Sequence, residues 1–334
     1  MADRPSSKPL PTIDRVAAES GVSRATVSRA FTRPDLLSRE TVRHVRAVAK
    51  RLGYVPNQTA RALSTGRHGN IALVVPDIAN PFFPPLIRAV QTRADDAGLS
   101  VFLGDSDEDP DREDVLISKF AGQVEGFVLA SPRLGKGQIL GHGQRRPMVL
   151  VNRDVPGLSR VLIDSAAGAR LAIHHLADLG HRTVAYVGGP VTSWSNQQRR
   201  EAVLRTSDTL GISIIEIPAE RATFEGGMTA VAAVLDARVT AAVAFDDLVA
   251  EGLLVGLAHK GVEVPQAFSV IGCDDVLGAR TNPPLTTISS PSAEAGRIAV
   301  DLLTDLLNNS SGREVVCRLD TGLINRSSTA PPSH

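Results

Sequence analysis

Apolar residues in the first 52 positions recur every three or four residues, the spacing of amphipathic helices. The pattern predicts a first helix over residues 13–20 behind a Thr12 cap, closed by a glycine turn. A second helix follows a Ser23 cap, and a third runs from a Ser38 cap to about residue 52, where Gly53 ends it. Two helices joined by a short turn and braced by a third are the sequence form of a helix-turn-helix domain.

The second helix, over residues 24–30, has one face for packing and one face left free. At 100° per residue its side chains divide into an apolar set and a polar set that holds both arginines. The first set is Thr26, Val27 and Ala30, and the second is Arg24, Ala25, Ser28 and Arg29.

From Ile71 onward the period changes to short β-branched runs that alternate with amphipathic helices. The runs include IALVVP, VFLGD, GFVLAS, MVLVN, VLID, TVAYVGG, ISIIEI, AAVAF and FSVIGCDD. This alternation predicts parallel sheets built by right-handed crossovers, with too many strands for one sheet. We expect an α/β body of two doubly wound lobes that divide near residues 160–163, with a cleft between them.

Residues 57–69 lie between the three N-terminal helices and the α/β body. Their sequence predicts only a short helix. Asn57 can cap a helix over residues 58–64, but an isolated helix of fewer than ~12 residues is marginal in water. We therefore expect it to fold only when something holds it.

The net charge of zero conceals an asymmetry. Residues 1–70 hold 13 Lys and Arg against 5 Asp and Glu, a charge of +8 that leaves −8 for the remainder. A basic head suits a polyanion such as double-stranded DNA, because neutralised phosphates release counterions. The alternative is a basic, solvated tail.

Localisation follows from what the sequence lacks. Cys273 and Cys317 have no paired short spacing of a metal knuckle or disulfide framework, which favours a reduced, cytoplasmic setting. No export signal or run of ~20 apolar residues is present, so we expect no membrane association.

Several motifs occur in order along nearly the whole chain. They are TIDRVAAESGVSRATVSRAF, GYVPNQTARALSTGR, IALVVPDIANPFF, VNRDVPG, HLADLGHRTVAYVGGP, VPQAFSVIGCDD and PPLTTI. With them the chain resembles the lactose- and purine-repressor (LacI-GalR) family of bacterial transcription regulators. The resemblance implies a homodimer on a palindromic operator, a body similar to periplasmic sugar-binding proteins, and a small-molecule effector in its cleft.

The resemblance also implies three passages of the chain between the lobes. The expected domains are a helix-turn-helix head (1–56), a hinge helix and linker (57–69), an N-terminal lobe (70–161 with 290–320) and a C-terminal lobe (162–289 with 321–334).

DNA reading is expected to rest on two arginines of the second helix. In the major groove, Arg24 and Arg29 can reach guanine O6 and N7, while Ala25 can contact a thymine methyl. Hydroxyls at helix starts or beside the groove suit phosphate oxygens, although each can serve as a helix cap alone. These are Thr12, Thr26, Ser28, Ser38 and Thr41.

In the family, the hinge helices pair in the minor groove, where a leucine from each subunit wedges into the central base step. The matching position is Leu63, with Ala60 facing the neighbouring helix and Asn57 near the DNA backbone. Leu63 could instead dock onto the body. Because the hinge orders only on its operator, a small change in lobe spacing can decide whether it folds.

Ligand contacts are expected at the carboxyl ends of the strands. Arg and Asp in one cleft suit sugar hydroxyls, and an indole offers a flat face for stacking. The candidates are Asp77, Phe82, Asn152, Trp194, Arg199, Phe224, Phe245, Asp246 and Asp275. The resemblance implies Arg199 and Asp275 as effector contacts, and a lobe-bridging ion pair is the alternative.

Two positions depart from the family pattern. Phe245 stands where many relatives have Asn, and Cys273 stands where an aromatic residue is usual. Both change the pocket floor, so a sugar ranks only slightly above a nucleobase. The effector's identity, whether it induces or co-represses, the operator sequence and any assembly beyond a dimer stay open.

Two other classes of protein fit the sequence less well. An enzyme is disfavoured because His174, His175 and His181 lack metal-ligand spacing, and adjacent aspartates on a strand point to opposite faces. No nucleotide-binding glycine loop occurs either, so we expect no cofactor and no metal. A solute-binding protein for transport would need an export signal and would have no basic head.

Overall fold

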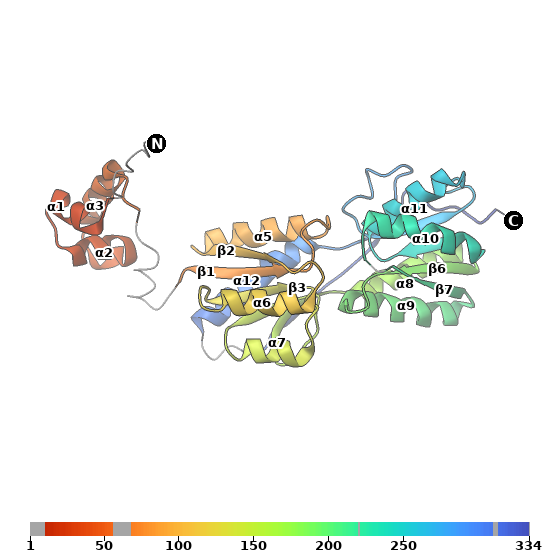
Figure 1. Ribbon diagram of the computed structural model, residues 1–334, viewed down its shortest axis with the longest axis horizontal. Coiled ribbons are helices and arrows are strands. Elements are labelled where there is room, and N and C mark those ends of the chain that lie inside the picture. The colour runs from red at the N-terminus through yellow and green to blue at the C-terminus, as the bar shows by residue number, and fades with distance from the viewer. Residues whose placement is uncertain (1–10, 56–67, 220, 310–312, 334) are drawn as a thin grey trace, which may run out of the picture. The chain divides into compact units, whose positions relative to one another are not determined.

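The computed structural model describes residues 11–55, 68–219, 221–309 and 313–333. The chain divides into two compact units, Met1–Gly69 and Asn70–His334 (Figure 1). No helix within the described ranges is both long and apolar enough to cross a lipid bilayer. The expected hinge helix, with Asn57, Ala60 and Leu63, lies outside the described residues.

The first unit contains the three helices that the apolar spacing predicted. They are α1 (Ile13–Ser20), α2 (Arg24–Thr32) and α3 (Arg39–Leu52), with a short 3₁₀ turn, η1 (Pro34–Leu36), before α3. Thr12, Ser23 and Ser38 each accept a hydrogen bond from the backbone N–H three residues further on, which confirms the three caps. α2 continues two residues beyond its predicted end at residue 30.

Apolar side chains from all three helices form a small core. Val16 of α1, Val27 and Ala30 of α2, and Val45 of α3 are fully buried. The apolar face predicted for α2 therefore packs inward, and its polar face is left at the surface.

The second unit contains two six-stranded sheets. The first sheet holds β1 (Asn70–Val75), β2 (Ser100–Asp105), β3 (Gly126–Ala130), β4 (Met148–Val151), β5 (Ser159–Ile163) and β11 (Val316–Leu319). The second holds β6 (Thr183–Gly188), β7 (Ser213–Pro218), β8 (Ala241–Ala244), β9 (Ser269–Asp274), β10 (Thr286–Ser289) and β12 (Leu323–Ile324). Their orders are β11-β5-β4-β3-β1-β2 and β12-β10-β9-β8-β6-β7. Pairing is parallel, except that β12 runs antiparallel to β10.

Helices cover both faces of each sheet (Figure 1). On the first sheet, α5 (Phe83–Asp96) and α12 (Ser292–Asn308) lie on one face, and α6 (Pro110–Phe120) and α7 (Lys136–Gly143) lie on the other. On the second, α8 (Ser165–Asp178) and α9 (Trp194–Leu210) lie opposite α10 (Phe224–Asp236) and α11 (Asp247–His259). The predicted α/β class with doubly wound sheets is confirmed.

The chain passes three times between the two sheets, which form the cores of an N-terminal and a C-terminal lobe. The passages follow β5, β10 and β11. A boundary between residues 161 and 162 falls inside β5, because the buried apolar run of this strand continues to Ile163 and Asp164 then caps α8.

Candidate DNA-binding surface and ligand cleft

The polar face of α2 is accessible. Arg24, Ala25 and Arg29 are exposed, whereas Val27 and Ala30 beneath them are fully buried. The Ser23 cap and the apolar core hold the helix in this rotation. The structure thus has an exposed helix face with two guanidinium groups, of the kind that reads guanine edges in the major groove.

The two arginines differ in their partners. Nε of Arg24 lies 3.0 Å from Oδ1 of Asp14, and both side chains are mostly exposed. Arg29 has no ion pair within the described part of the chain. An exposed ion pair is worth at most ~1 kcal/mol, so Asp14 holds Arg24 only loosely and DNA can take its place.

Several hydroxyl groups that were expected to contact phosphates make hydrogen bonds within the helix-turn-helix head. Thr12 and Ser38 accept backbone hydrogen bonds as caps of α1 and α3. Oγ1 of Thr26 lies 3.0 Å from Oγ of Ser23, and Oγ1 of Thr41 lies 2.8 Å from Oγ of Ser38. The capping role is therefore confirmed for Thr12 and Ser38, and phosphate contact stays a prediction for all five hydroxyls, Ser28 included.

The carboxyl ends of strands from both lobes meet at a small, partly open cavity of about 30 Å³. This is the place where parallel α/β sheets bind ligands. The N-terminal lobe contributes Asn80, Phe82, Phe83, Glu108, Ser131, Arg133 and Asn152. The C-terminal lobe contributes Ser193, Ser195, Arg199, Ala222, Phe245, Asp246 and Asp274.

Five of the nine predicted ligand contacts line this cavity: Phe82, Asn152, Arg199, Phe245 and Asp246. Asp77, Trp194, Phe224 and Asp275 do not line it. Oδ1 of Asp77 accepts a hydrogen bond from the backbone N–H of Ala79, so this carboxylate closes its own turn. Trp194 and Phe224 begin α9 and α10, where their neighbours Ser193, Ser195 and Ala222 face the cavity instead.

The alternative given for Arg199 and Asp275, an ion pair between them, does not form: Arg199 pairs with Asp274 instead. Nη2 of Arg199 lies 3.1 Å from Oδ1 of Asp274, whereas Asp275 lies 2.6 Å from Nη2 of Arg326. Asp274 is the last residue of β9 and has a φ of 105°, and Asp275 has a φ of 53°. The two carboxylates consequently point to different partners, one in the cleft and one towards the C-terminal segment.

Arg199 is held at the floor of the cavity by three groups. Besides Asp274, the carbonyl oxygen of Phe245 accepts a hydrogen bond from its Nη1, and the guanidinium carbon lies 4.9 Å from the centre of the Phe245 ring. Nε of Arg199 and Oγ of Ser195 are buried and have no hydrogen-bond partner among the described residues. A polar ligand with an acceptor and a donor would satisfy both atoms.

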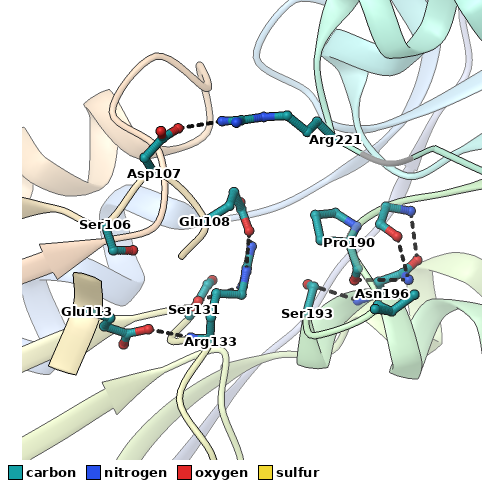
Figure 2. A network of polar contacts seen from close by, with 12 residues as sticks. Ser106, Asp107, Glu108, Glu113, Ser131, Arg133, Pro190, Ser193, Asn196 and Arg221 are labelled. Atoms are coloured by element: carbon teal, nitrogen blue, oxygen red, sulfur yellow. Dashed lines mark hydrogen bonds and ion pairs between the residues drawn. The ribbon is translucent and has the colours of Figure 1, made fainter. Parts of the chain in front are cut away.

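Among the described residues, contacts at two depths join the lobes across the cleft. Nδ2 of Asn80 donates to Oδ2 of Asp246 at 2.8 Å, deep in the cavity. Near the rim, Nη2 of Arg221 lies 2.5 Å from Oδ1 of Asp107 (Figure 2). Burial raises the pKa of Asp246 to about 7, with a contribution from the charge of Asp274, and hydrogen bonds from Val249 and Asn80 oppose the rise.

A second arginine lines the cavity from the N-terminal lobe, and the sequence interpretation missed it. Nη2 of Arg133 donates to Oε1 of Glu108 at 2.8 Å, and its Nε donates to the other carboxylate oxygen (Figure 2). The backbone N–H groups of Arg133 and Leu134 donate to Oε2 of the buried Glu113, at 2.7 and 3.2 Å. The only sequence signal for Glu108 and Arg133 was their position after β2 and β3. The predicted ligand contacts occupy similar positions after other strands.

Backbone strain gathers at the same place. Seven non-glycine residues within the described ranges have a positive φ, and six of them lie at or just after the carboxyl ends of strands. The six are Asp107, Glu108, Ser131, Asn152, Asp274 and Asp275. Such conformations persist where the surroundings hold them in place, and they concentrate at functional sites.

Two of the three histidines considered as metal ligands have structural partners. His175 hydrogen-bonds to Thr329, and His181 hydrogen-bonds to Thr240 and to the carbonyl of Ala330. Across the described residues, no group of three or more His, Cys, Asp or Glu side chains is placed to hold a metal ion.

Comparison with known proteins identifies the class that this architecture defines. Residues 12–57 match the family model for bacterial regulatory proteins of the lacI family, and residues 173–329 match a periplasmic binding protein-like domain. The repressor CytR of Escherichia coli K12 is 32% identical, with 95% of this chain and 96% of CytR aligned.

Solved structures agree. The lac repressor dimer bound to operator and the anti-inducer ONPF has a TM-score of 0.87 at 25% identity, covering 97% of this chain and all of that one. A lacI-family regulator from Enterococcus faecium with bound ribose has a TM-score of 0.73 at 29% identity, covering 79% of this chain and all of that one.

A helix-turn-helix head followed by a two-lobed binding body defines a ligand-responsive transcription regulator. The chain belongs to the lacI family of bacterial regulatory proteins and is a DNA-binding transcriptional regulator.

Proposed function

We propose that this regulator represses transcription from the cytoplasm, as a homodimer on a palindromic operator, under the control of a small polar effector in the cleft. The observation that carries the proposal is the exposed face of α2, with Arg24 and Arg29, on a chain whose body holds a polar, strained cleft between two lobes. We infer no catalytic activity, because the relatives that align along the chain are transcription regulators.

On the DNA side, Arg24 and Arg29 read guanines, and Ala25 contacts a thymine methyl. Thr12, Thr26, Ser28, Ser38 and Thr41 contact phosphates and set the register. Asn57, Ala60 and Leu63 act at the minor groove, as the resemblance implies, with Leu63 as the apolar wedge.

On the ligand side, the effector is a sugar or related polyhydroxylated molecule. Arg199 and Asp274 offer donors and acceptors at the floor, and Phe82 and Phe245 offer apolar faces for a ring. The relative with bound ribose supports a molecule of this class.

Selection of DNA fragments from a genomic library tests the DNA-binding arm. The purified protein should retain palindromic fragments, and the affinity should fall steeply as salt rises, because Lys and Arg displace counterions from phosphates. A metabolite screen against the bound operator then identifies the effector. A protein that prefers no palindromic duplex, with or without small molecules, would contradict the proposal.

A further inference from the structure

The guanidinium group of Arg133 is almost wholly removed from water at the cleft. Its side chain is 4% exposed, and that of Glu108 is 18% exposed. A buried cation is costly without a counter-charge and strong hydrogen bonds. Glu108 supplies both, because its two oxygens accept from Nε and Nη2 of Arg133, and the carbonyl of Ser131 accepts from Nη1 at 2.6 Å.

The other arginine of the cleft also forms a buried ion pair. Arg199 is paired with Asp274, and their side chains are 6% and 5% exposed. The one remaining charged group that lines the cavity is Asp246. The cleft thus offers polar atoms of both kinds but no unpaired positive charge among its lining residues.

The protein holds Glu108 in position. Its backbone N–H donates to the carbonyl of Pro76 at 2.7 Å, and its φ of 63° fixes an unusual backbone turn. Glu113 anchors the backbone of Arg133 from behind, as Figure 2 shows. An anionic ligand would have to break this bidentate pair and leave the Glu108 carboxylate close to its own charge.

We propose that Glu108 sets the charge specificity of the cleft: by occupying Arg133, it excludes anionic ligands such as phosphorylated or carboxylated molecules. This inference rests on the proposed ligand-binding role of the cleft. It separates free sugars and nucleosides, which the cleft accepts, from sugar phosphates and nucleotides, which it rejects.

Glu108→Gln tests the proposal, because glutamine keeps the shape of the side chain and removes its charge. Inorganic phosphate is the probe, titrated by calorimetry against the full-length protein without DNA, with chloride at equal ionic strength as the reference. Unpaired Arg133 should then bind phosphate at least ~10-fold more tightly than the wild type does, the scale of one charge-assisted hydrogen bond. Asp111→Asn is the control, since it removes an exposed carboxylate of the same loop and helix start that does not line the cavity.

The double variant Glu108→Gln with Arg133→Met should lose the gained affinity, which assigns it to Arg133. No gain in Glu108→Gln, or an equal gain in Asp111→Asn, overturns the proposal. So does phosphate binding by the wild type that Arg133→Met abolishes. If Glu108→Gln does not fold in chloride, folding in phosphate supports the proposal and failure to fold in both overturns it.

The titration is independent of the DNA experiment. A protein that lacks operator preference can still show the Glu108-dependent gain, and a protein with operator preference can fail to show it. The two failures are therefore distinguishable.

Discussion

Individual arginines of this protein differ in whether their guanidinium groups are paired or free to contact a partner. Arg133 and Arg199 are buried and paired in the cleft, whereas Arg29 is exposed and free of ion pairs among the described residues. A buried, paired guanidinium acts through its fixed hydrogen bonds, and an exposed one is available to a partner.

Arg29→Ala is expected to weaken binding to the selected operator by ~1–3 kcal/mol, the value of a bidentate contact with guanine. Binding to random DNA should change less, because there the substitution removes one positive charge near the phosphates and no base contact. Fluorescence anisotropy on both duplexes measures the two effects, with Arg205→Ala, an exposed arginine of the body, as the charge control. Equal losses on operator and random DNA would exclude base reading by Arg29.

Asp274 and Asp275 form a natural pair of test positions. Asp274→Asn should abolish the ligand response of operator binding, because it removes the counter-charge of the buried Arg199 and a wall of the cavity. Asp275→Asn should keep the response and lower only the thermal midpoint, since Asp275 binds Arg326 away from the cavity. A normal response in Asp274→Asn would remove this carboxylate from the ligand site.

At the scale of elements, two loops close the cleft from opposite lobes. The loop between β2 and α6 carries Asp107, and the segment before α10 carries Arg221. Deeper in the cavity, Asn80 and Asp246 join the same two lobes. Lobe closure thus has contacts that involve no ligand, and a ligand adds to them.

Arg221→Ala should shift the lobes towards an open arrangement. The pair is about half exposed on both sides, so its loss is worth up to ~1 kcal/mol, or about fivefold in the closure equilibrium. Small-angle scattering of the ligand-free protein should report a larger radius of gyration, and 1 M salt should produce the same change in the wild type by screening. Arg205→Ala, which breaks an ion pair within α9, should leave the radius unchanged.

Elements were far more predictable than contacts in the cleft. The caps Thr12, Ser23 and Ser38 and the alternating strands follow from local periodicity, which a sequence displays directly. Glu108 and Arg133 lie in loops without a period, and their pairing joins residues 25 positions apart through a positive-φ turn. Asp274 was missed for a related reason, since strand alternation fails where φ changes sign at the end of β9.

At the scale of the whole molecule, buried carboxylates couple stability to pH. Burial raises the pKa of Glu113 to about 7, against the lowering effect of the Arg133 and Leu134 backbone N–H groups. The folded protein therefore retains a proton that the unfolded chain releases near its ordinary pKa, and this stabilisation is lost as pH rises towards 7. Burial lowers the pKa of His175 and His181, so their contribution to the free energy of unfolding increases as pH rises. A single pH scan therefore mixes two opposite effects.

Comparison with Glu113→Gln isolates the carboxylate. The free energy of unfolding of the wild type relative to this variant should fall by on the order of 3 kcal/mol between pH 4.5 and 8. Denaturant titrations at several pH values measure it, and Glu263→Gln, at an exposed carboxylate, should show no such trend. A constant difference across the range would contradict the assignment of a raised pKa to Glu113.

Coupling between ligand and DNA is a property of the entire chain, and thermodynamics restricts its form. A ligand changes operator affinity only if it binds the DNA-competent arrangement of the lobes with a different affinity from the other arrangement. By reciprocity, the operator must change ligand affinity by the same factor and in the same direction. Anisotropy with and without saturating ligand, and calorimetry with and without operator, should return equal factors of ~5–150, and Asp274→Asn should reduce both to one. If a ligand alters operator binding but the operator does not alter the affinity for that ligand, the two sites are not coupled through a shared lobe equilibrium.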